Sequence, residues 1–409
     1  MKIAILSHLK YPIAEPFKGG LEMITHALTR GLQERGHHVD LFAIEGTDPA
    51  LRPTIVQAPR IDHEISGVPA PDHPDFNEEF VEHHHIYLDL MLKMRHSDYD
   101  VVFNNTLHYI PITMAPAAGT PVVTTLHVPP FPFLQSAVMM GRHYGGNHYV
   151  AISEHVRRVW GQFDDIDDVV YNGIDLDFFN FNAEANTREA FWCGRICHVK
   201  APHLALKAAR RAGVFLNLAG PMSDRDYFKR EVEPLLDRRY NRYLGHMEQD
   251  EMRRYLAEAS VYLFTSVWDE PYGLVLAEAL ACGTPIAAFR SGAVPEILTE
   301  KTGRIVAKGD AEALAGALLE AQTLNRHDCR ARAEQFCDRE RMVDEYAALF
   351  ERIAATNTRK KRRNTQRMDV PTASRRSSVR LPGTVPVSVP VPGLRAASER
   401  NTLVNRVKV

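Results

Sequence analysis

The stretch SVYLFTSVWDEPYGLVLAEALACGTPIAAF (Ser260–Phe289) has the pattern of a strand, a helix and a second strand. Two short runs rich in β-branched, aromatic and other apolar residues flank a segment of small and apolar residues with helical character. Strands that alternate with helices predict a parallel sheet. The helix contains Glu278, and Glu270 precedes it. Because an unpaired buried carboxylate is costly, we expect a ligand or a cation to meet both groups.

The same alternation runs through most of the chain and restarts near Phe178. Before that point, the predicted strands are KIAIL (from Lys2), HHVDLFAI (from His37), DVVFNN (from Asp100), PVVTTLH (from Pro121) and HYVAIS (from His148). After it they are EAFWCGRI (from Glu189), VFLNLAGP (from Val214) and the two strands of the opening stretch. The pattern predicts an α/β fold of two facing, doubly wound, Rossmann-like domains, with the ligand site in the cleft between them. The expected boundaries are 1–180, 181–337, a final helix over 338–355 and a tail over 356–409.

Composition is typical of a two-domain intracellular protein. The chain has 409 residues, of which 45% are hydrophobic and 24% charged, which suffices for two packed cores. Its five cysteines show no framework of short spacings, as expected in a reducing compartment. The N-terminal sequence MKIAILSHLKYP lacks a cleavage site and is predicted to be a strand. No run approaches the length of a membrane span. We therefore expect a cytoplasmic protein.

The tail is basic although the rest of the chain is acidic. Residues 356–409 hold 13 Lys and Arg against two Asp and Glu, whereas the remainder holds 36 against 49. The tail has no aromatic residue and is rich in Pro, Ser and Arg, which predicts disorder. One interpretation is a solvated appendage. The other is a tether to anionic lipid, where each base gains about 1 kcal/mol, and a peripheral position at the inner membrane face. Nucleic-acid binding is not expected, because no aromatic residues are available for base stacking.

The two acids are suited to a polyhydroxylated ligand. Pro271 and Gly273 are expected at the start of the helix, which leaves Glu270 on the loop that faces the strand ends. Glu278 follows about two turns later, so both carboxylates can line one cleft and accept hydrogen bonds from sugar or ribose hydroxyls. The alternative is structural: Glu270 favoured by the helix dipole and Glu278 partly exposed.

A second set of residues is suited to phosphate. Arg195 and Lys200 lie in the loop after the first strand of the second domain, where two cations can clamp a diphosphate. Backbone N–H groups at two helix starts can add to them. These are the amides of Gly19, Gly20, Gly273, Leu274 and Val275. The alternative is that the two bases are ordinary surface residues and that Gly19–Gly20 is a turn.

Taken together, the motifs resemble a known family. They are GG-x-E (Gly19–Glu22), RGHHV (from Arg35), NGID (from Asn172), GR…K (Arg195 and Lys200), EPYGLVLAEALACGTPIAAF (from Glu270) and PEIL (from Pro295). In this order they resemble the retaining nucleotide-sugar glycosyltransferases of family 4, which have the GT-B architecture. The resemblance covers roughly Met1–Ala355.

The resemblance implies roles for single residues. Glu270 and His127, the latter in TLHVPP, would be the catalytic residues beside the donor sugar. Glu278 would bind the ribose, and Arg195 and Lys200 the diphosphate, helped by backbone at Gly20. Residues 1–180 would bind the acceptor and residues 181–337 the nucleotide sugar, and the last helix would cross back onto the first domain.

The implied activity is transfer of a hexose from a nucleoside-diphosphate sugar, of the UDP-glucose or GDP-mannose type, with retention of configuration. The acceptor would be a glycan, a lipid-linked sugar or a small aglycone. No metal or other cofactor is expected, since cations and backbone donors already face the phosphates. Two alternatives remain: a nucleotide-sugar 2-epimerase on the same architecture, and a non-catalytic nucleotide-sugar-binding protein whose tail is the functional part.

Two positions depart from the family pattern. Ser291 stands where the family often has glycine, and Ser266 lacks the usual preceding proline. We expect neither departure to touch the charged residues. The acid pairs Asp98–Asp100 and Asp175–Asp177 are expected to be structural and not metal ligands.

Overall fold

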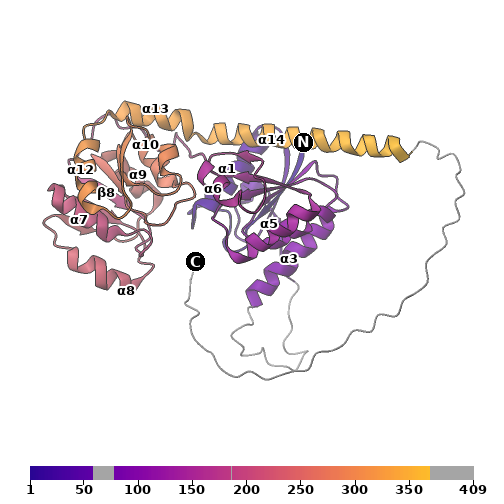
Figure 1. The fold of residues 1–409 in the computed structure, drawn as a ribbon, viewed down its shortest axis with the longest axis horizontal. Helices are drawn as coiled ribbons and strands as arrows, with labels where there is room; N and C mark the ends of the chain where they lie inside the picture. The colour runs from indigo at the N-terminus through magenta and orange to yellow at the C-terminus, as the bar shows by residue number, and fades with distance from the viewer. Residues whose placement is uncertain (59–77, 186, 369–409) are drawn as a thin grey trace, which may run out of the picture. The chain divides into compact units, whose positions relative to one another are not determined.

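The computed structural model describes residues 1–58, 78–185 and 187–368 of the chain. Residues Met1–Lys361 form one unit, which contains a seven-stranded and a six-stranded parallel sheet. Helices lie on both faces of each sheet (Figure 1). The prediction of an α/β chain with two Rossmann-like domains is therefore confirmed.

The first sheet has the strand order β3-β2-β1-β4-β5-β6-β7. Its central strands are buried along nearly their whole length, because both faces of a parallel sheet are covered. The strands are β1 (Lys2–Ser7), β2 (His38–Ala43), β3 (Thr54–Ile55), β4 (Val101–Asn105), β5 (Val122–Leu126), β6 (Asn147–Ala151) and β7 (Asp168–Val169). The helices are α1 (Gly20–Glu34), α3 (Glu78–Met94), α4 (Tyr109–Met114), α5 (Pro132–Tyr144) and α6 (Glu154–Trp160), with short 3₁₀ turns η1 (Pro49–Leu51) and η2 (Ala115–Ala117).

The second sheet has the strand order β10-β9-β8-β11-β12-β13. Its strands are β8 (Ala190–Cys193), β9 (Leu216–Ala219), β10 (Asn241–Tyr243), β11 (Val261–Phe264), β12 (Ile286–Phe289) and β13 (Gly303–Val306). Its helices are α7 (Pro202–Ala212), α8 (Arg225–Tyr227), α9 (Gln249–Glu258), α10 (Leu274–Ala281), α11 (Val294–Ile297), α12 (Ala311–Ala321) and α13 (Arg326–Phe336), with the short turns η3 (Phe228–Val232) and η4 (Glu233–Leu235). Apolar side chains of α7 and α12 cover one face of this sheet.

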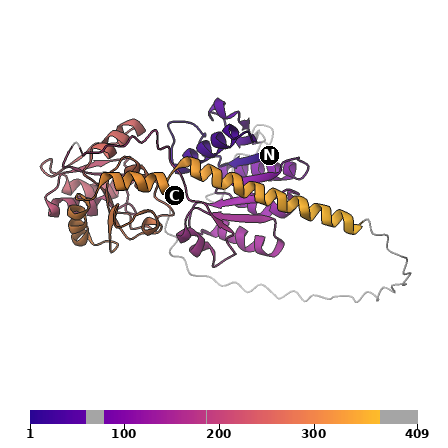
Figure 2. The same cartoon turned by 90° about the horizontal axis from the view of Figure 1, so that it is seen from above.

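The last helix, α14 (Arg339–Met368), packs on the first sheet (Figure 2). The ring centroids of Phe350 and of Phe103 on β4 are 5.2 Å apart, and Val343 fills the space beside Gly31 of α1. The expectation that this helix ends near Ala355 is wrong, because it continues to Met368. Residues 356–368 contain neither Pro nor Gly and are rich in Arg and Lys, so nothing in this segment ends a helix. Residues 369–409 of the predicted tail lie outside the described residues.

One set of contacts between the two sheet domains lies near α6. Ser153 Oγ donates a hydrogen bond to the carbonyl of Pro271 at 2.6 Å. The carboxylate of Glu296 accepts hydrogen bonds from the backbone amides of Glu154 and His155 at 2.8 and 2.7 Å, and so caps the start of α6. None of the helices in the described ranges is both long and apolar enough to cross a lipid bilayer.

Candidate active site

The candidate residues follow the strands that flank the switch point of each sheet. The switch point is the place in a sheet where successive strands begin to be added on the opposite side. It lies between β1 and β4 in the first sheet and between β8 and β11 in the second. Gly19 and Gly20 follow β1, whereas Arg195 and Lys200 follow β8 and Glu270 follows β11. Ligands of open parallel sheets bind at the carboxyl ends of strands at such points. The topology therefore brings the predicted residues of each domain to its ligand-binding edge.

Glu270 is held from several sides in the loop between β11 and α10. Its side chain is buried, and its carboxylate pairs with the ammonium of Lys200 and accepts a 2.7 Å hydrogen bond from Ser266 Oγ. Its amide donates to Ser291 Oγ at 3.4 Å, and its carbonyl accepts from Ala293 N at 2.9 Å. The expectation that positions 266 and 291 do not touch the charged residues is therefore wrong: both serines contact Glu270.

Gly292 allows this loop to close on Glu270. A Cβ at position 292 would lie 2.1 Å from the Glu270 carbonyl oxygen, and the residue has a φ of +50°. Any side chain here would displace Glu270, because the contact is with backbone. The loop after β12 is thus part of the support for the Glu270 carboxylate, a long-range contact that no local motif indicates.

The two predicted phosphate-binding cations differ in their surroundings. Lys200 is paired with Glu270, and its carbonyl accepts a 2.9 Å hydrogen bond from Thr265 Oγ1 on the neighbouring strand end. Arg195 is exposed and makes no hydrogen bond or ion pair within the described residues. Lys200 is therefore fixed in place, whereas the Arg195 guanidinium is accessible to a ligand.

Glu278 is a buried acid without a partner. It lies on α10, only 7% exposed, and its carboxylate makes no hydrogen bond or ion pair within the described part of the chain. Burial raises the pKa of Glu278 to about 7. Burial and the nearby Glu278 also raise the pKa of the Cys193 thiol, which places Glu278 near the end of β8. An unpaired acid in an apolar setting has no structural benefit, and ligand hydroxyls would satisfy it.

The start of α10 presents free backbone donors. The helix begins at Leu274, three residues after the Pro271 start expected from the sequence, because Gly273 adopts a left-handed conformation with φ +98° as its N-cap. The amides of Gly273, Leu274 and Val275 make no hydrogen bond among the described residues. They are the unpaired donors of a helix N-terminus, where an anion is favoured.

At the start of α1 a carboxylate already faces the backbone. Gly19 is the N-cap, and Glu22 lies buried in the first turn, 2.8 Å from His8 Nε2. Burial alone would raise the pKa of Glu22, but His8 and the amides of Glu22 and Gly19 outweigh it and lower that pKa. Fewer amides are therefore free for a phosphate here than the Gly19–Gly20 pair suggests.

His127 follows β5 and contacts the strand next to it. Its Nε2 is hydrogen bonded to Asn105 Oδ1 at the end of β4. The side chain is partly accessible, yet burial, with a smaller effect of His8, lowers the pKa of His127 to about 3. The imidazole is therefore neutral at physiological pH, which suits a hydrogen-bonding partner of a hydroxyl.

The acid pairs of the sequence are engaged in structural contacts. Lys2 pairs with Asp98 at 2.5 Å, and its amide donates to Asp100. Asp175 caps the following turn and pairs with Arg339 at 2.8 Å. Among the described residues no group of three His, Cys, Asp or Glu side chains is arranged to hold a metal ion.

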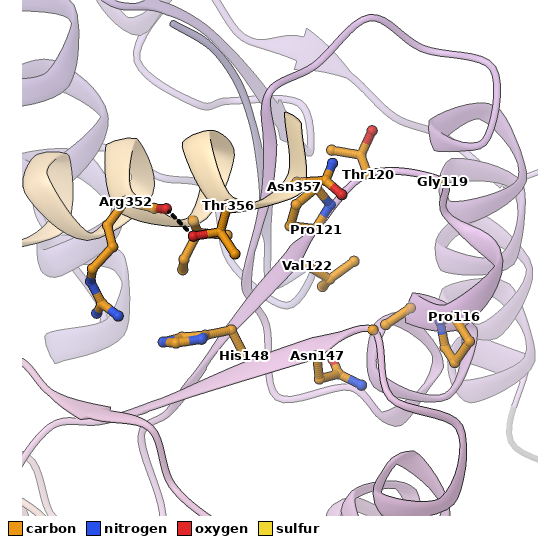
Figure 3. Close-up of a pocket in the computed structure, with 13 residues that line it drawn as sticks. Pro116, Gly119, Thr120, Pro121, Val122, Asn147, His148, Arg352, Thr356 and Asn357 are labelled. Atoms are coloured by element: carbon orange, nitrogen blue, oxygen red, sulfur yellow. Dashed lines mark hydrogen bonds between the residues drawn. The ribbon is translucent and has the colours of Figure 1, made fainter. Parts of the chain in front are cut away.

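A cavity of about 390 Å³ lies at the opposite edge of the first sheet (Figure 3). It is lined by the starts of β5 and β6 and by α14. Its charged side chains are engaged: Arg352 and His148 both bind Asp168, at 2.7 and 2.6 Å. Because β5 is five residues long, roughly 16 Å separates this amino edge from His127. The cavity is not part of the candidate site.

Comparison with known proteins identifies the class. Residues 18–178 match the family model described as Glycosyltransferase Family 4, and residues 174–336 match Glycosyl transferases group 1. The chain belongs to the family 4 glycosyltransferases. It is therefore a glycosyltransferase, with the GT-B architecture of two facing Rossmann-like domains.

Several relatives and solved structures are similar to the chain. Glycogen synthase of Mycobacterium tuberculosis is 26% identical over 348 residues, which span 73% of this chain and 81% of the relative. The D-inositol 3-phosphate glycosyltransferase of Mycolicibacterium paratuberculosis is 32% identical over 172 residues, 37% of this chain and 39% of the relative. The fold is similar to that of HepE from Anabaena in complex with UDP, with 19% identity, a TM-score of 0.66 and coverage of 86% and 100%. It is also similar to sucrose-phosphate synthase from Thermosynechococcus elongatus, with 19% identity, a TM-score of 0.67 and coverage of 87% and 100%.

Proposed function

We propose that the protein transfers a hexose from a nucleoside-diphosphate sugar to an acceptor hydroxyl, with retention of anomeric configuration. The observation that carries the proposal is Glu278: a buried carboxyl without a partner, on the helix that follows the Lys200–Glu270 pair. A hydroxyl-bearing ligand next to a cationic loop gives both features a purpose.

Each residue has a role in this proposal. Glu278 accepts hydrogen bonds from ribose hydroxyls, and Glu270 binds a hydroxyl of the sugar. Arg195, Lys200 and the free amides at the start of α10 bind the diphosphate. As the bond from the anomeric carbon to the diphosphate breaks, the leaving group gains charge, and these donors stabilise it. The acceptor oxygen bonds to the same face of the anomeric carbon, and its proton passes to the departing phosphate oxygen.

The relatives support the donor class. One relative is named glycogen synthase, and HepE has been solved with UDP and with UDP-glucose. Relatives over shorter stretches include phosphatidyl-myo-inositol mannosyltransferases. We therefore propose UDP-glucose as the first donor to test and GDP-mannose as the second. The acceptor is proposed to bind to the first domain, as a glycan, a lipid-linked sugar or a small aglycone.

The proposal includes transfer without a metal ion, because Arg195, Lys200 and backbone amides supply the positive charge. It places the reaction in the cytoplasm, with the basic residues after 355 in peripheral contact with anionic lipid. Both parts are open to direct tests. Activity that disappears with EDTA and returns with Mg²⁺ would contradict the first, and a full-length chain that does not sediment with phosphatidylserine vesicles would contradict the second.

A thermal-shift panel of UDP, GDP, ADP and TDP tests the donor site. A ligand at a hundred times its dissociation constant stabilises the protein by about 2.7 kcal/mol. We expect one nucleotide to stabilise wild type and to do so much less in Glu278→Gln, while the exposed Glu300→Gln control responds as wild type does. No response to any nucleotide, or equal responses in all three proteins, would contradict the proposal.

A product assay tests the reaction itself. The chain is incubated with labelled UDP-glucose or GDP-mannose and a pool of acceptors, and the anomeric configuration of the product is read by NMR. Transfer with retention supports the proposal. An epimer formed without acceptor would indicate the 2-epimerase, and biological activity that survives Glu270→Gln but not deletion of residues 356–409 would indicate a non-catalytic binder.

A further inference from the structure

We propose that Asn105 and Thr25 are positioning residues that fix the tautomer of His127, with the proton on Nε2 and a bare lone pair on Nδ1. The inference rests on the proposed function only in that it places His127 beside the donor sugar. The tautomer itself follows from hydrogen bonds within the protein. Its consequence is that Nδ1 can accept a hydrogen bond from a sugar hydroxyl but cannot donate one.

The chain of hydrogen bonds starts at a group that can only accept. The carbonyl of Leu21, in the first turn of α1, accepts a 2.7 Å hydrogen bond from Thr25 Oγ1. A hydroxyl has one hydrogen, so Thr25 Oγ1 must act as the acceptor towards its other partner. That partner is the side-chain amide of Asn105, 2.7 Å away, and the contacting atom must therefore be its Nδ2. The direction of donation is thus set by a backbone carbonyl.

The orientation of Asn105 then determines the proton on His127. With Nδ2 turned to Thr25, the oxygen Oδ1 faces His127 Nε2. A carbonyl oxygen accepts, so Nε2 must carry the proton. Nδ1 makes no hydrogen bond to any described residue, and in the neutral ring it holds a lone pair. The neutral state is secured because burial, assisted by His8, lowers the pKa of His127 to about 3.

The supporting residues lie in the interior of the first domain. Thr25 and Asn105 are fully buried, and β4 and β5 are neighbours in the sheet. Leu21 directly follows Gly20, which contacts Leu274 of the second domain. The first turn of α1 therefore both meets the donor domain and, through two side chains, orients the histidine of the first domain.

This arrangement predicts a specificity. A lone pair accepts a hydrogen bond from a hydroxyl but repels the oxygens of a carboxylate or phosphate. The sugar group that meets His127 must therefore be a hydrogen-bond donor, which in a hexose is a hydroxyl. A set of deoxy analogues of the donor should contain one member whose kcat/KM falls about tenfold or more, the loss expected when a buried acceptor is left unpaired. In His127→Ala that member should no longer differ from the parent sugar.

Asn104 offers a matched control. It is the same residue type on the same strand and is fully buried, but its side chain has other partners. Its Nδ2 donates to Thr124 Oγ1 at 3.2 Å, and its Oδ1 accepts from Thr106 Oγ1 at 2.7 Å. Asn104→Ala and Asn105→Ala remove equal volumes from adjacent buried positions. Thr25→Val removes the hydroxyl with little change in volume, and Thr25→Ser retains the hydroxyl and should keep the wild-type tautomer.

The experiment is ¹⁵N NMR of the His127 side chain, assigned by its loss in His127→Ala, combined with donor kinetics. Wild type, Asn104→Ala and Thr25→Ser should show the proton on Nε2. Asn105→Ala and Thr25→Val should show mixed tautomers and a kcat/KM about tenfold lower, as expected for a lost buried hydrogen bond. A proton on Nδ1 in wild type, or an Asn104→Ala spectrum changed as much as that of Asn105→Ala, would overturn the inference. Because the spectrum needs no substrate, failure of the proposed function would leave this result standing.

Discussion

Gly20, the first residue of α1, lies directly against Leu274, the first residue of α10: a Cβ on Gly20 would be 2.4 Å from Leu274 Cδ1. The N-termini of two helices from the two sheet domains therefore meet. Each helix start carries a partial positive charge, and the start of α10 also has unpaired amides, so their meeting point favours a doubly charged anion such as a diphosphate.

Gly20→Val is expected to lower kcat/KM for the donor about tenfold, because overpacking of a close contact costs about 1–3 kcal/mol. The added methyl groups must push Leu274 and the start of α10 away. Gly316→Val is the control, since position 316 on α12 has open space around it. Adding Leu274→Ala to Gly20→Val should restore part of the activity. A Gly20→Val enzyme as active as the Gly316→Val enzyme would show that the contact has no role.

Glu270→Gln and Lys200→Met are each expected to lower kcat about 100-fold, the scale of losing one electrostatic contact to the reacting groups. Each leaves an unpaired charge that is buried (Glu270) or partly buried (Lys200), so the unfolding free energy should also fall, by up to about 3 kcal/mol. The double variant removes both charges. It should regain stability in urea unfolding while its activity stays low. Recovery of activity together with stability would show that the pair is only structural.

The fold could be predicted from the sequence where the elements are buried. β1, β4, β5, β8, β11 and β12 are buried and mainly apolar, and the sequence pattern predicts all of them. The sequence pattern does not predict the edge strands β3, β7, β10 and β13, because they are two to four residues long and only partly covered, so no apolar run marks them. The end of α14 cannot be predicted from charge composition, because a basic segment is typical of disorder while Arg and Lys are also good helix formers.

The candidate site could be predicted as a set of residues but not as a set of contacts. Glu270, Glu278, Lys200 and Arg195 were found because charges beside glycines at strand ends are typical of ligand sites. That Lys200 pairs with Glu270, and that Ser291 supports it, depends on loops more than 20 residues apart meeting. Asn105 lies at the end of the predicted strand DVVFNN. A polar side chain that ends an apolar run is the one feature of the sequence that could have indicated a role for it at the site.

Glu278 should make unfolding free energy depend on pH. Its pKa in the folded chain is raised to about 7 from an ordinary value near 4.5, so the folded state holds the proton more tightly than the unfolded chain. The unfolding free energy therefore falls by roughly 3 kcal/mol in total as the pH rises from 4.5 to 7, and this contribution is constant above pH 7. Urea unfolding of Glu278→Gln should lack this component, whereas Glu300→Gln should retain it. Parallel pH profiles for wild type and Glu278→Gln would contradict the assignment.

Glu296 joins the two domains through charge-assisted hydrogen bonds, and its loss should lower the stability of the protein. Its carboxylate accepts from the amides of Glu154 and His155 at the start of α6 and from Tyr171 Oη at 2.9 Å. Glu296→Ala leaves these donors unpaired and should lower the unfolding free energy by about 1.5–3 kcal/mol. Tyr171→Phe removes only the hydroxyl and should lower the unfolding free energy by less.

Burial raises the pKa of Tyr171 and the Glu296 carboxylate raises it further, so Glu296→Ala should also make this phenol titrate at lower pH. Ultraviolet titration of Glu296→Ala, with Tyr171→Phe as the reference that identifies the signal, measures the shift; an unchanged titration and an unchanged urea midpoint would show that Glu296 does not hold this junction.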